Sequence, residues 1–253
     1  MEKLPVLLSI PHGSNHIPPV VENRVILSAE DIHDDIDPYT REIYDLSEHV
    51  EAVVVAHAAR TIVDVNRSPD DRPPQNPDGV IKSMTCLGRP IYHGGWWPDE
   101  PVTDHLLHHY YLPFHQAIQA ALDNPRIKLA LDCHSMHPVG PAIGPDTGQT
   151  RPLICLGNLH NQSCEESTLR HLAQCLQMAF GLEEQQIALN TPFAGGYITR
   201  TYGQHSAPWI QLELNRILYL DPAWFDATTL SVAPERLAAL RRQFMAALET
   251  FFA

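Results

Sequence analysis

The alternation of polar and apolar side chains in residues 209–214 constrains the fold of this chain more than any other feature. A period of two predicts a strand whose side chains point alternately to opposite faces of a sheet. This pattern places Gln211, Glu213 and Asn215 on one face and Ile210, Leu212 and Leu214 on the other. The chain is therefore expected to form a sheet with titratable groups on one face.

Two further strand-like segments lead directly into histidines. Residues 5–10 run into His12, which lies in a Pro-His-Gly-Ser turn. Residues 127–133 precede His134, and Asp132 shares a face with this histidine because side chains alternate along a strand. Ligand sites in open α/β sheets gather at the carboxyl ends of the strands. We therefore expect both histidines to lie at such a site.

The order of the expected elements indicates an α/β fold. Alternating strands and helices predict a mixed or mostly parallel sheet with helices on both faces, and one domain spanning residues 1–253 is the simplest organisation. Strands are expected near residues 5–10, 52–57, 60–65, 127–133, 152–158 and 208–214, and helices at 38–49, 103–122, 163–179 and 234–252.

Two local features refine this pattern. Ser163 followed by Glu166 three residues later predicts a capping box at the start of a helix. Residues 66–101 are rich in Pro, Asp, Asn and Gly, and a loop of this length is uncommon in a compact domain and often functional. The segment is either a cover for the site or an irregular surface excursion.

The composition excludes several classes of partner. The chain has 17 Lys and Arg against 30 Asp and Glu, a formal net charge of −13, whereas nucleic acids and anionic membranes require a basic face. No apolar run approaches the ~20 residues of a membrane span, and the N-terminus enters a strand too early for a signal peptide. The five cysteines form no CxxC pair, which favours reduced thiols in the cytoplasm.

Two histidines and a glutamate at one sheet edge are the components of a zinc hydrolase. A catalytic zinc site takes three protein ligands and leaves one position open. The neutral imidazoles of His12 and His134 would be two of these ligands, and Glu213 would be the base. A structural zinc site would instead need four protein ligands, usually cysteines, and the cysteines of this chain are not paired.

The third ligand has three candidates just before an expected helix, namely Asp34, Asp35 and Asp37. Their alternative role is to stabilise the helix, because carboxylates favour the positive N-terminal end. Asp132 is a candidate for a supporting role, since a carboxylate that accepts a hydrogen bond from a ligating histidine fixes its tautomer.

Three arginines lie in or beside polar motifs and are candidates to bind an acidic substrate. Arg67 follows Asn66 at the end of a strand-like segment, and Arg200 closes a run that begins with two glycines. A guanidinium binds a carboxylate through two parallel hydrogen bonds. Arg216 lies so near Glu213 that it is expected to support the site through an internal ion pair.

These residues resemble the N-formylglutamate amidohydrolase (N-formylglutamate deformylase) family. The matching runs follow one another in order from residue 5 to about 222. They are Ser9-Ile10-Pro11-His12-Gly13-Ser14 with Ile17-Pro18, Asp37 ahead of Glu42-Ile43-Tyr44, Val63-Asp64-Val65-Asn66-Arg67, Leu131-Asp132-Cys133-His134-Ser135-Met136, the run 190–200, and Gln211-Leu212-Glu213-Leu214-Asn215-Arg216 followed by Leu218-Tyr219.

The resemblance implies a three-layer α/β/α fold of the zinc-exopeptidase (phosphorylase/hydrolase-like) type. It also implies hydrolysis of N-formyl-L-glutamate to L-glutamate and formate, as in histidine degradation. Asp37 matches the family's aspartate and would complete one Zn²⁺ site, with Asp35 as the alternative. The substrate is then a small anionic N-acyl amino acid. The resemblance thus implies that His12, Asp37 and His134 bind the metal and that Glu213 is the base. Arg67, Arg200 and Asn66 would bind the substrate, and Asp132 and Arg216 would support the site.

The sequence also departs from its relatives. Zinc carboxypeptidases, which the family resembles in fold, place a glutamate three residues after the first histidine, and here that position is Asn15. Residues 35–39 lack the Asp-Trp-His run associated with histidine-degradation deformylases, so a different N-acyl amino acid stays open as the substrate. Two other classes are considered: a cysteine hydrolase built on Cys133, and a non-enzymatic metal- or ligand-binding protein of the same fold. The sequence leaves the oligomeric state open.

Overall fold

The computed structural model of the protein describes residues 2–141, 146–205 and 207–253 and is built around a six-stranded sheet. The strand order is β2-β1-β3-β6-β4-β5. Strands β2, β1, β3 and β6 are parallel to one another, whereas β4 and β5 run in the opposite direction. The strands are β1 Leu4–Ile10, β2 Val50–Val55, β3 Leu129–Met136, β4 Ile154–Gly157, β5 Ile187–Leu189 and β6 Trp209–Asn215, with a separate ribbon of β7 Phe225–Asp226 and β8 Ser231–Val232.

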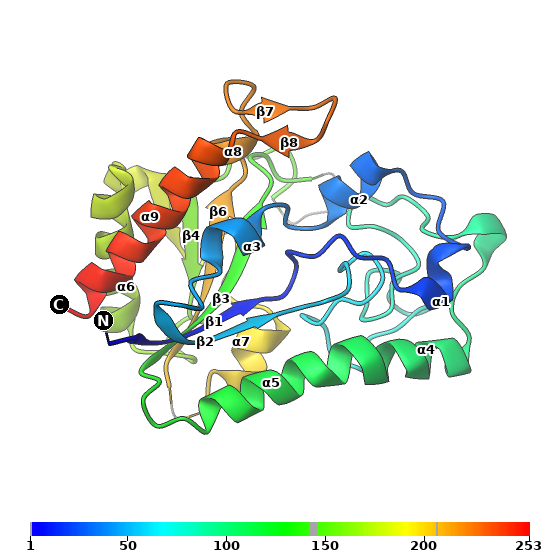
Figure 1. Cartoon of the computed structure of the whole chain (residues 1–253), viewed down its shortest axis with the longest axis horizontal. Helices are drawn as coiled ribbons and strands as arrows, with labels where there is room; N and C mark the ends of the chain where they lie inside the picture. The colour runs from blue at the N-terminus through cyan, green and yellow to red at the C-terminus, as the bar shows by residue number, and fades with distance from the viewer. Residues whose placement is uncertain (1, 142–145, 206) are drawn as a thin grey trace.

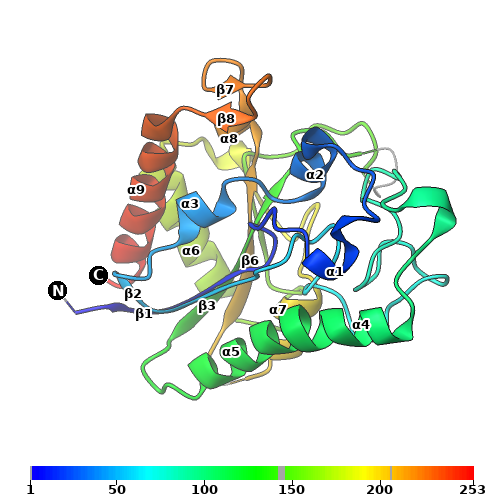
Figure 2. The same cartoon turned by 45° about the vertical axis from the view of Figure 1, so that its right-hand side comes forward.

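Helices cover both faces of this sheet (Figures 1 and 2). Helices α6 and α9 pack against each other on one face together with α3, and α4, α5 and α7 lie on the opposite side. These layers confirm the predicted α/β fold with a mixed, mostly parallel sheet. The helices are α1 Pro19–Glu22, α2 Ala29–Asp35, α3 Thr40–Tyr44, α4 Glu100–Leu106, α5 Leu112–Leu122, α6 Glu166–Phe180, α7 Tyr197–Tyr202, α8 Ile217–Leu220 and α9 Pro234–Phe251, with short helical turns η1 His93–Gly95, η2 Leu107–Tyr111 and η3 Glu184–Gln186.

The sheet separates two hydrophobic cores. Leu131, Cys133 and Leu212 point into the core formed with α3, α6 and α9. Ala130 and Trp209 belong to the core on the other side, which includes side chains of α4, α5 and α7. The faces predicted from the alternation in β3 and β6 are therefore confirmed.

The polar side chains of β3 and β6 lie on the face of the second core, toward the carboxyl ends of the strands. Across these neighbouring strands His134 pairs with Glu213, and Asp132 pairs with Gln211. Ser9 of β1 joins the same face, where its Oγ donates a hydrogen bond to Asp132 Oδ1 at 3.2 Å. One face of three adjacent parallel strands thus carries the groups that the sequence singled out.

The prediction of a strand at 60–65 is wrong. The amides of Ile62 and Val63 donate to the carbonyl of Ala59 in a turn, and Val63 forms an isolated bridge with Ile81. These apolar side chains are buried in the second core, which explains why a turn has a strand-like sequence. The structure also adds β5, which is too short to produce a recognisable pattern.

The helix predicted at 38–49 is shorter in the structure. Tyr39 precedes α3 with a φ of 63°, which is outside the helical region, and Asp45 ends it in an extended conformation. The helix therefore occupies the five residues Thr40–Tyr44.

The capping box predicted from Ser163 and Glu166 is also wrong. Glu165 is the residue at the N-terminal cap of α6, and its side chain makes no capping hydrogen bond. The Oγ of Ser163 instead donates to the carbonyl of Trp209 at 2.7 Å, which fastens this loop to the start of β6.

The helix predicted at 103–122 is present with an irregular centre. Between α4 and α5 the amide of Leu112 donates to the carbonyl of Leu107, five residues back, as in a π-helix. Pro113 follows immediately and has no amide hydrogen to continue the α-helical pattern.

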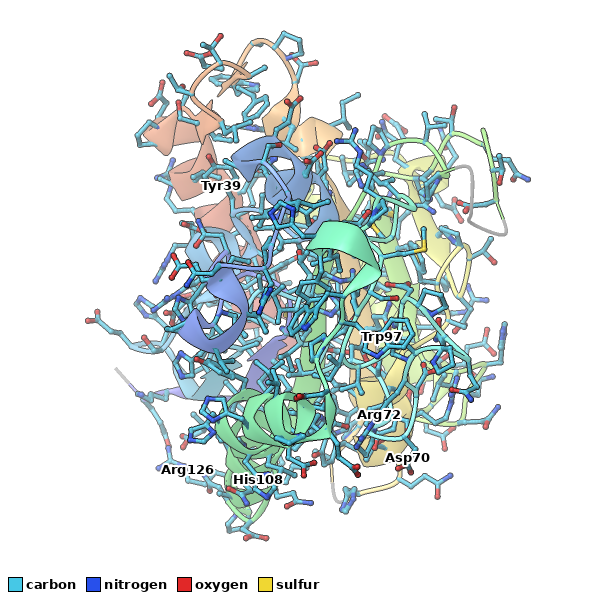
Figure 3. All side chains as sticks on the ribbon, turned by 90° about the vertical axis from the view of Figure 1, so that its right-hand side faces the viewer. Tyr39, Asp70, Arg72, Trp97, His108 and Arg126 are labelled. Carbon is cyan, nitrogen blue, oxygen red and sulfur yellow. The ribbon has the colours of Figure 1, made fainter. Side chains whose placement is uncertain are left out.

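Residues 66–101 form an irregular segment at one end of the molecule, where Figure 3 shows Asp70, Arg72 and Trp97. Lys82 is fully buried beneath this segment. Its Nζ lies 2.5 Å from Asp78 Oδ1 and 3.6 Å from Asp35 Oδ2. This ion pair ties the segment to α2.

Two expectations from the composition concern the cysteines and membrane-spanning segments. The five cysteines are free, and Cys133, Cys155 and Cys175 are buried. Among the described residues, no helix combines the length and the apolar character needed to cross a bilayer.

Candidate metal and catalytic site

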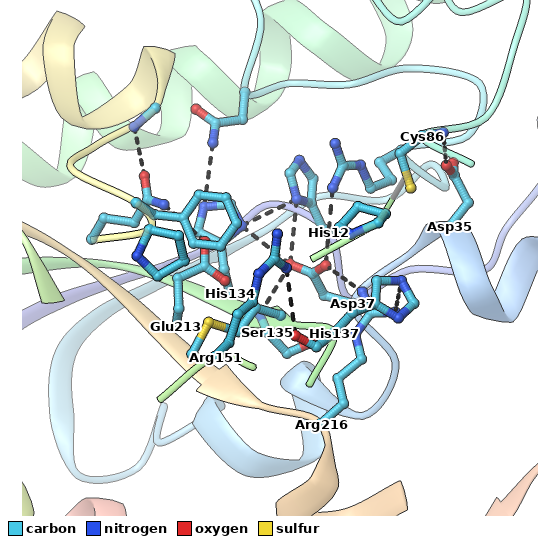
Figure 4. A pocket seen from close by; sticks show the side chains of 18 of the residues that line it. His12, Asp35, Asp37, Cys86, His134, Ser135, His137, Arg151, Glu213 and Arg216 are labelled. Carbon is cyan, nitrogen blue, oxygen red and sulfur yellow. Dashed lines mark hydrogen bonds and ion pairs between the residues drawn. The ribbon is translucent and has the colours of Figure 1, made fainter. Parts of the chain in front are cut away.

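Three buried side chains meet at the carboxyl edge of the sheet and form a group that could hold one metal ion (Figure 4). The Nδ1 atom of His134 lies 3.1 Å from His12 Nδ1 and 3.1 Å from Asp37 Oδ2, and His12 Nδ1 lies 3.4 Å from the same oxygen. A tetrahedral zinc ion with bonds of ~2.0–2.1 Å would separate its ligand atoms by about 3.3 Å. The triangle formed by these atoms fits such an ion.

The backbone brings His12 and Asp37 together before their side chains meet. The amide of Asp37 donates to the carbonyl of His12 at 3.0 Å. A Cβ atom at Gly13 would lie 2.8 Å from Thr40 Oγ1, so the absence of a side chain lets the turn after β1 pack against the start of α3.

Each histidine uses its second ring nitrogen to contact a buried carboxylate. His134 Nε2 lies 3.3 Å from Asp132 Oδ2, and His12 Nε2 lies 2.8 Å from Asp64 Oδ1. Such pairs place the proton on Nε2 and direct the lone pair of Nδ1 toward the metal position. The structure thus places Asp132 where the sequence expected it.

Asp64 and Arg60 support the site, and sequence reasoning did not assign them this role. The other carboxylate oxygen of Asp64 accepts a hydrogen bond from Arg60 Nη2 at 2.8 Å. Burial would raise the pKa of Asp64, but the charges of Arg60 and His12 hold it well below its usual value. The available signal was an aspartate directly after the apolar residues Ile62 and Val63.

The structure distinguishes Asp37 from the neighbouring aspartates. Asp35 turns away from the histidines, accepts a hydrogen bond from the amide of Cys86 at 2.6 Å and pairs with Lys82. Burial would raise the pKa of Asp37, but hydrogen bonds with the two histidines keep it well below its usual value.

Arg216 contacts Asp37 and not Glu213, whereas the sequence suggested an ion pair between Arg216 and Glu213. Its Nη2 donates to Asp37 Oδ1 at 3.0 Å, and its Nε donates to Ser135 Oγ at 3.1 Å. The amide of Ser135 donates to the other oxygen of Asp37 at 3.2 Å. The carboxylate is therefore held in one orientation.

Glu213 lies beside the metal position on the strand next to His134. Its Oε1 accepts a hydrogen bond from Gln211 Nε2 at 2.8 Å. Burial raises the pKa of Glu213 to about 7, although the charge of His134 acts in the opposite direction. A carboxyl group with a pKa near neutrality is suited to accept and return a proton.

A cavity of about 460 Å³ opens over these groups. Segment 66–101 supplies part of its wall, which supports a role in covering the site over the alternative of a surface excursion. The lining includes the expected residues His12, Asp37, Asn66, Arg67, His134, Glu213 and Arg216, and also Arg60, Asp78, Cys86, His137, Arg151 and Phe193.

The expected substrate-binding residues have different positions in the structure. Arg67 lines the cavity, and its Nη2 pairs with Asp78 Oδ2 at 3.1 Å. Asn66 contacts His134 Nε2 at 3.3 Å and accepts a hydrogen bond from the amide of Ile198 at 2.8 Å, so it links the histidine to α7. Arg200 is the exception: it is exposed on α7 and is not among the cavity-lining residues.

Cys133 is in the wrong place for a cysteine hydrolase. Its side chain points into the first core, away from the face that carries His134. Burial raises the pKa of this thiol well above its usual value, which disfavours the reactive thiolate.

The comparisons with known proteins identify the family and the fold. The profile of the N-formylglutamate amidohydrolase family matches residues 4–220. N-formylglutamate deformylases from Pseudomonas aeruginosa and Pseudomonas putida are 29% and 27% identical to this chain, each over 87% of this chain and 83% of the relative. The crystal structure of an N-formylglutamate amidohydrolase from Ralstonia eutropha superposes with a TM-score of 0.79 over 100% of this chain and 94% of that chain at 18% identity, and so shares the fold. Since the family profile covers most of the sequence, the chain belongs to the N-formylglutamate amidohydrolase family.

Proposed function

We propose that the chain, as one catalytic domain spanning residues 1–253, hydrolyses the amide of a small N-acylated acidic amino acid with the help of a bound divalent metal. N-formyl-L-glutamate is the proposed substrate, and L-glutamate and formate are the products, as in histidine degradation. The names of the two Pseudomonas relatives support the substrate. The observation that carries the proposal is the triangle of His12, Asp37 and His134 beside buried Glu213.

The ligand atoms of these three residues suit zinc, because imidazole nitrogen and carboxylate oxygen are its usual ligands and the chain provides no cysteine cage. A bound zinc ion would supply Lewis-acid chemistry, lowering the pKa of water and polarising the amide carbonyl. The five free cysteines are consistent with a reducing compartment, and we place the reaction in the cytoplasm.

In this proposal Glu213 moves the proton. Gln211 holds Oε1 by a hydrogen bond, which fixes the plane of the carboxylate and leaves Oε2 to accept a proton from the attacking water. The same oxygen then returns the proton to the nitrogen of the leaving amine. Because Glu213 is only 6% exposed, bulk water competes little for the proton.

The cavity also provides positive charge for an acidic substrate. Arg67 is the most exposed of the four arginines that line the cavity, with 30% of its side chain exposed. A guanidinium on this wall can bind one substrate carboxylate through parallel hydrogen bonds. A neutral substrate would leave that group without its partner.

The decisive experiment is a panel assay on zinc-loaded protein. We expect N-formyl-L-glutamate to be hydrolysed faster than N-acetyl-L-glutamate, N-succinyl-L-glutamate or N-formyl-L-leucine. The Glu213→Gln variant should retain metal and fold but lose ~10²–10⁴-fold in kcat, the usual contribution of a general base. Glu249→Gln, on the exposed side of α9, is the matched control. Absence of hydrolysis by the metal-loaded wild type, or full kcat in Glu213→Gln, would contradict the proposal.

A further inference from the structure

Arg151 is the cavity arginine that neither the sequence motifs nor the proposed chemistry uses. It stands at the base of the connection between β3 and β4, and its side chain is only 6% exposed. Figure 4 shows this side chain extending into the cavity rather than away from it. A buried guanidinium is costly unless a carboxylate or a ligand neutralises it.

The backbone of Arg151 is fixed to the catalytic strand. Its carbonyl accepts a hydrogen bond from Asn215 Nδ2 at 3.3 Å, and the next carbonyl, of Pro152, accepts one from the same nitrogen at 2.9 Å. Asn215 lies two residues after Glu213 in β6. The position of the guanidinium is thereby tied to the position of the base.

The guanidinium is held as a flat fork. Its Nε lies 2.6 Å from Asp146 Oδ2 and its Nη2 lies 2.9 Å from Asp146 Oδ1, which is the two-point geometry that arginine uses for carboxylates. The ring of Phe193, another cavity residue, stacks against it at 4.9 Å. The contact with the Phe193 ring and the two-point contact with Asp146 together fix the plane of the guanidinium, and a carboxylate would bind in this plane.

We propose that Arg151 is a specificity-determining residue that binds one of the two carboxylates of an acidic substrate, and that Asp146 occupies the same fork when no such ligand is present. The inference rests on the proposed function, because it assigns the substrate of that site to the dicarboxylates. Asp146 is largely buried, with 13% of its side chain exposed, so it protects the guanidinium from being left unpaired.

In this proposal Arg67 and Arg151 each bind one carboxylate of the substrate. Arg67 comes from segment 66–101, and Arg151 comes from the connection after β3, so the two guanidinium groups reach the cavity from different parts of the chain. An N-acyl glutamate has one carboxylate for each. Arg151 therefore takes the role that the sequence gave to Arg200.

The test measures binding, so that it does not depend on turnover. Zinc-loaded Glu213→Gln protein is titrated by calorimetry with N-formyl-L-glutamate and with its two monoamides, one lacking the γ-carboxylate and the other lacking the α-carboxylate. Arg151→Met should weaken binding of the diacid by roughly tenfold to a hundredfold, the usual effect of losing a charged hydrogen-bond partner. This penalty should disappear for the one monoamide that lacks the carboxylate bound by Arg151.

Asp146→Asn should have the opposite effect, because it removes the competing carboxylate and frees the fork for the ligand. Its preference for the diacid over that monoamide should exceed the preference of the parent protein. Arg151→Lys keeps the charge but not the planar fork, and it should behave nearly as Arg151→Met does. Arg170→Met, which breaks the exposed pair between Arg170 and Glu166 on α6, is the control and should change none of these values.

A purely bracing role for Arg151 predicts a different result. Arg151→Met would then weaken all three ligands equally or not at all, and Asp146→Asn would leave the preference unchanged or lower it; either result overturns the inference. Unfolding curves of each variant identify loss of fold, and Arg151→Lys provides the measurement if Arg151→Met does not fold. Failure of the wild type to hydrolyse any N-formyl amino acid would refute the proposed function alone, since the binding preferences would still report on Arg151.

Discussion

Asp37 shows how a single carboxylate is adapted to hold a metal. One of its oxygens faces His12 and His134, and the other accepts a hydrogen bond from Arg216. Asp35 lies two residues earlier and is equally buried, but its charge is neutralised by Lys82. The two side chains therefore have different surroundings: Asp37 is the proposed metal ligand, and Asp35 anchors segment 66–101.

The first prediction separates these two roles. Asp37→Asn should reduce metal content strongly and affect stability less, because it removes a ligand. Asp35→Asn should keep the metal but lower the free energy of unfolding by roughly 1–3 kcal/mol, because buried Lys82 loses one of its two carboxylate partners and keeps only Asp78. Metal analysis and denaturant unfolding of both variants check this expectation. The reverse pattern would make Asp35 the ligand.

The second prediction concerns the carboxylates behind the histidines. Asp64→Asn preserves the shape of the side chain but removes the charge that orients His12, and it should weaken metal affinity by roughly 10–100-fold. Asp132→Asn should do the same through His134. Competition with a chromogenic chelator measures the affinity, and the exposed substitution Asp104→Asn is the control. Unchanged affinity in both buried variants would show that these carboxylates do not tune the ligands.

At the scale of elements, the sequence predicted the parts of the site that lie on regular strands. The alternation in β3 and β6 is a direct consequence of strand geometry, so the shared face of Asp132, His134 and Glu213 followed from the sequence. Arg60 and Arg151 lie outside helices and strands, where no period links sequence to direction. Their partners, such as Asp146, depend on loop conformations that only the folded chain defines.

Helix α5 gives the third prediction. His115 is buried between α5 and α7, where its ring nitrogens contact Tyr202 Oη at 2.9 Å and the carbonyl of Val65 at 3.0 Å. Burial lowers the pKa of His115 to about 4. Below pH 6.5 His115 takes up a proton in the unfolded chain but stays neutral in the folded chain. The free energy of unfolding therefore falls as the pH decreases from 6.5 to 4.

His115 alone should contribute about 1.4 kcal/mol of this loss per pH unit. The His115→Gln variant should therefore show a shallower dependence of the free energy of unfolding on pH in this window. Urea unfolding at several pH values measures it, with the exposed His108→Gln on the same side of the molecule as the control. An identical pH dependence in wild type and His115→Gln would mean that this histidine is protonated in the folded state as well.

At the scale of the whole molecule, the sheet gathers ligands that are far apart in the sequence. His12 follows β1, Asp37 follows α2, and His134 lies in β3, which pairs directly with β1. The site therefore exists only when the central strands are assembled. A metal bound there should be linked to the stability of the entire domain.

The fourth prediction follows from this linkage. A ligand that binds only the folded state stabilises it by about 4 kcal/mol at 1,000 times its Kd, which corresponds to a rise in Tm on the order of 10 °C for a domain of this size. We expect chelator-treated protein to show this rise when zinc is added back. The variant with both His12→Ala and His134→Ala should show none of it. An equal shift in this variant would place the stabilising ion elsewhere.

The close backbone contact between His12 and Asp37 also bears on which ions the protein accepts. Because the amide of Asp37 donates to the carbonyl of His12, the backbones of the two residues are held close, and His12 Nδ1 lies 3.4 Å from Asp37 Oδ2. Calcium prefers six to eight oxygen ligands at roughly 2.3–2.6 Å, and magnesium prefers an octahedron of oxygens. A narrow triangle with nitrogen at two of its three corners suits neither of these abundant hard cations. A single turn after β1 that keeps the two proposed ligands close would therefore favour zinc over calcium and magnesium at the proposed site.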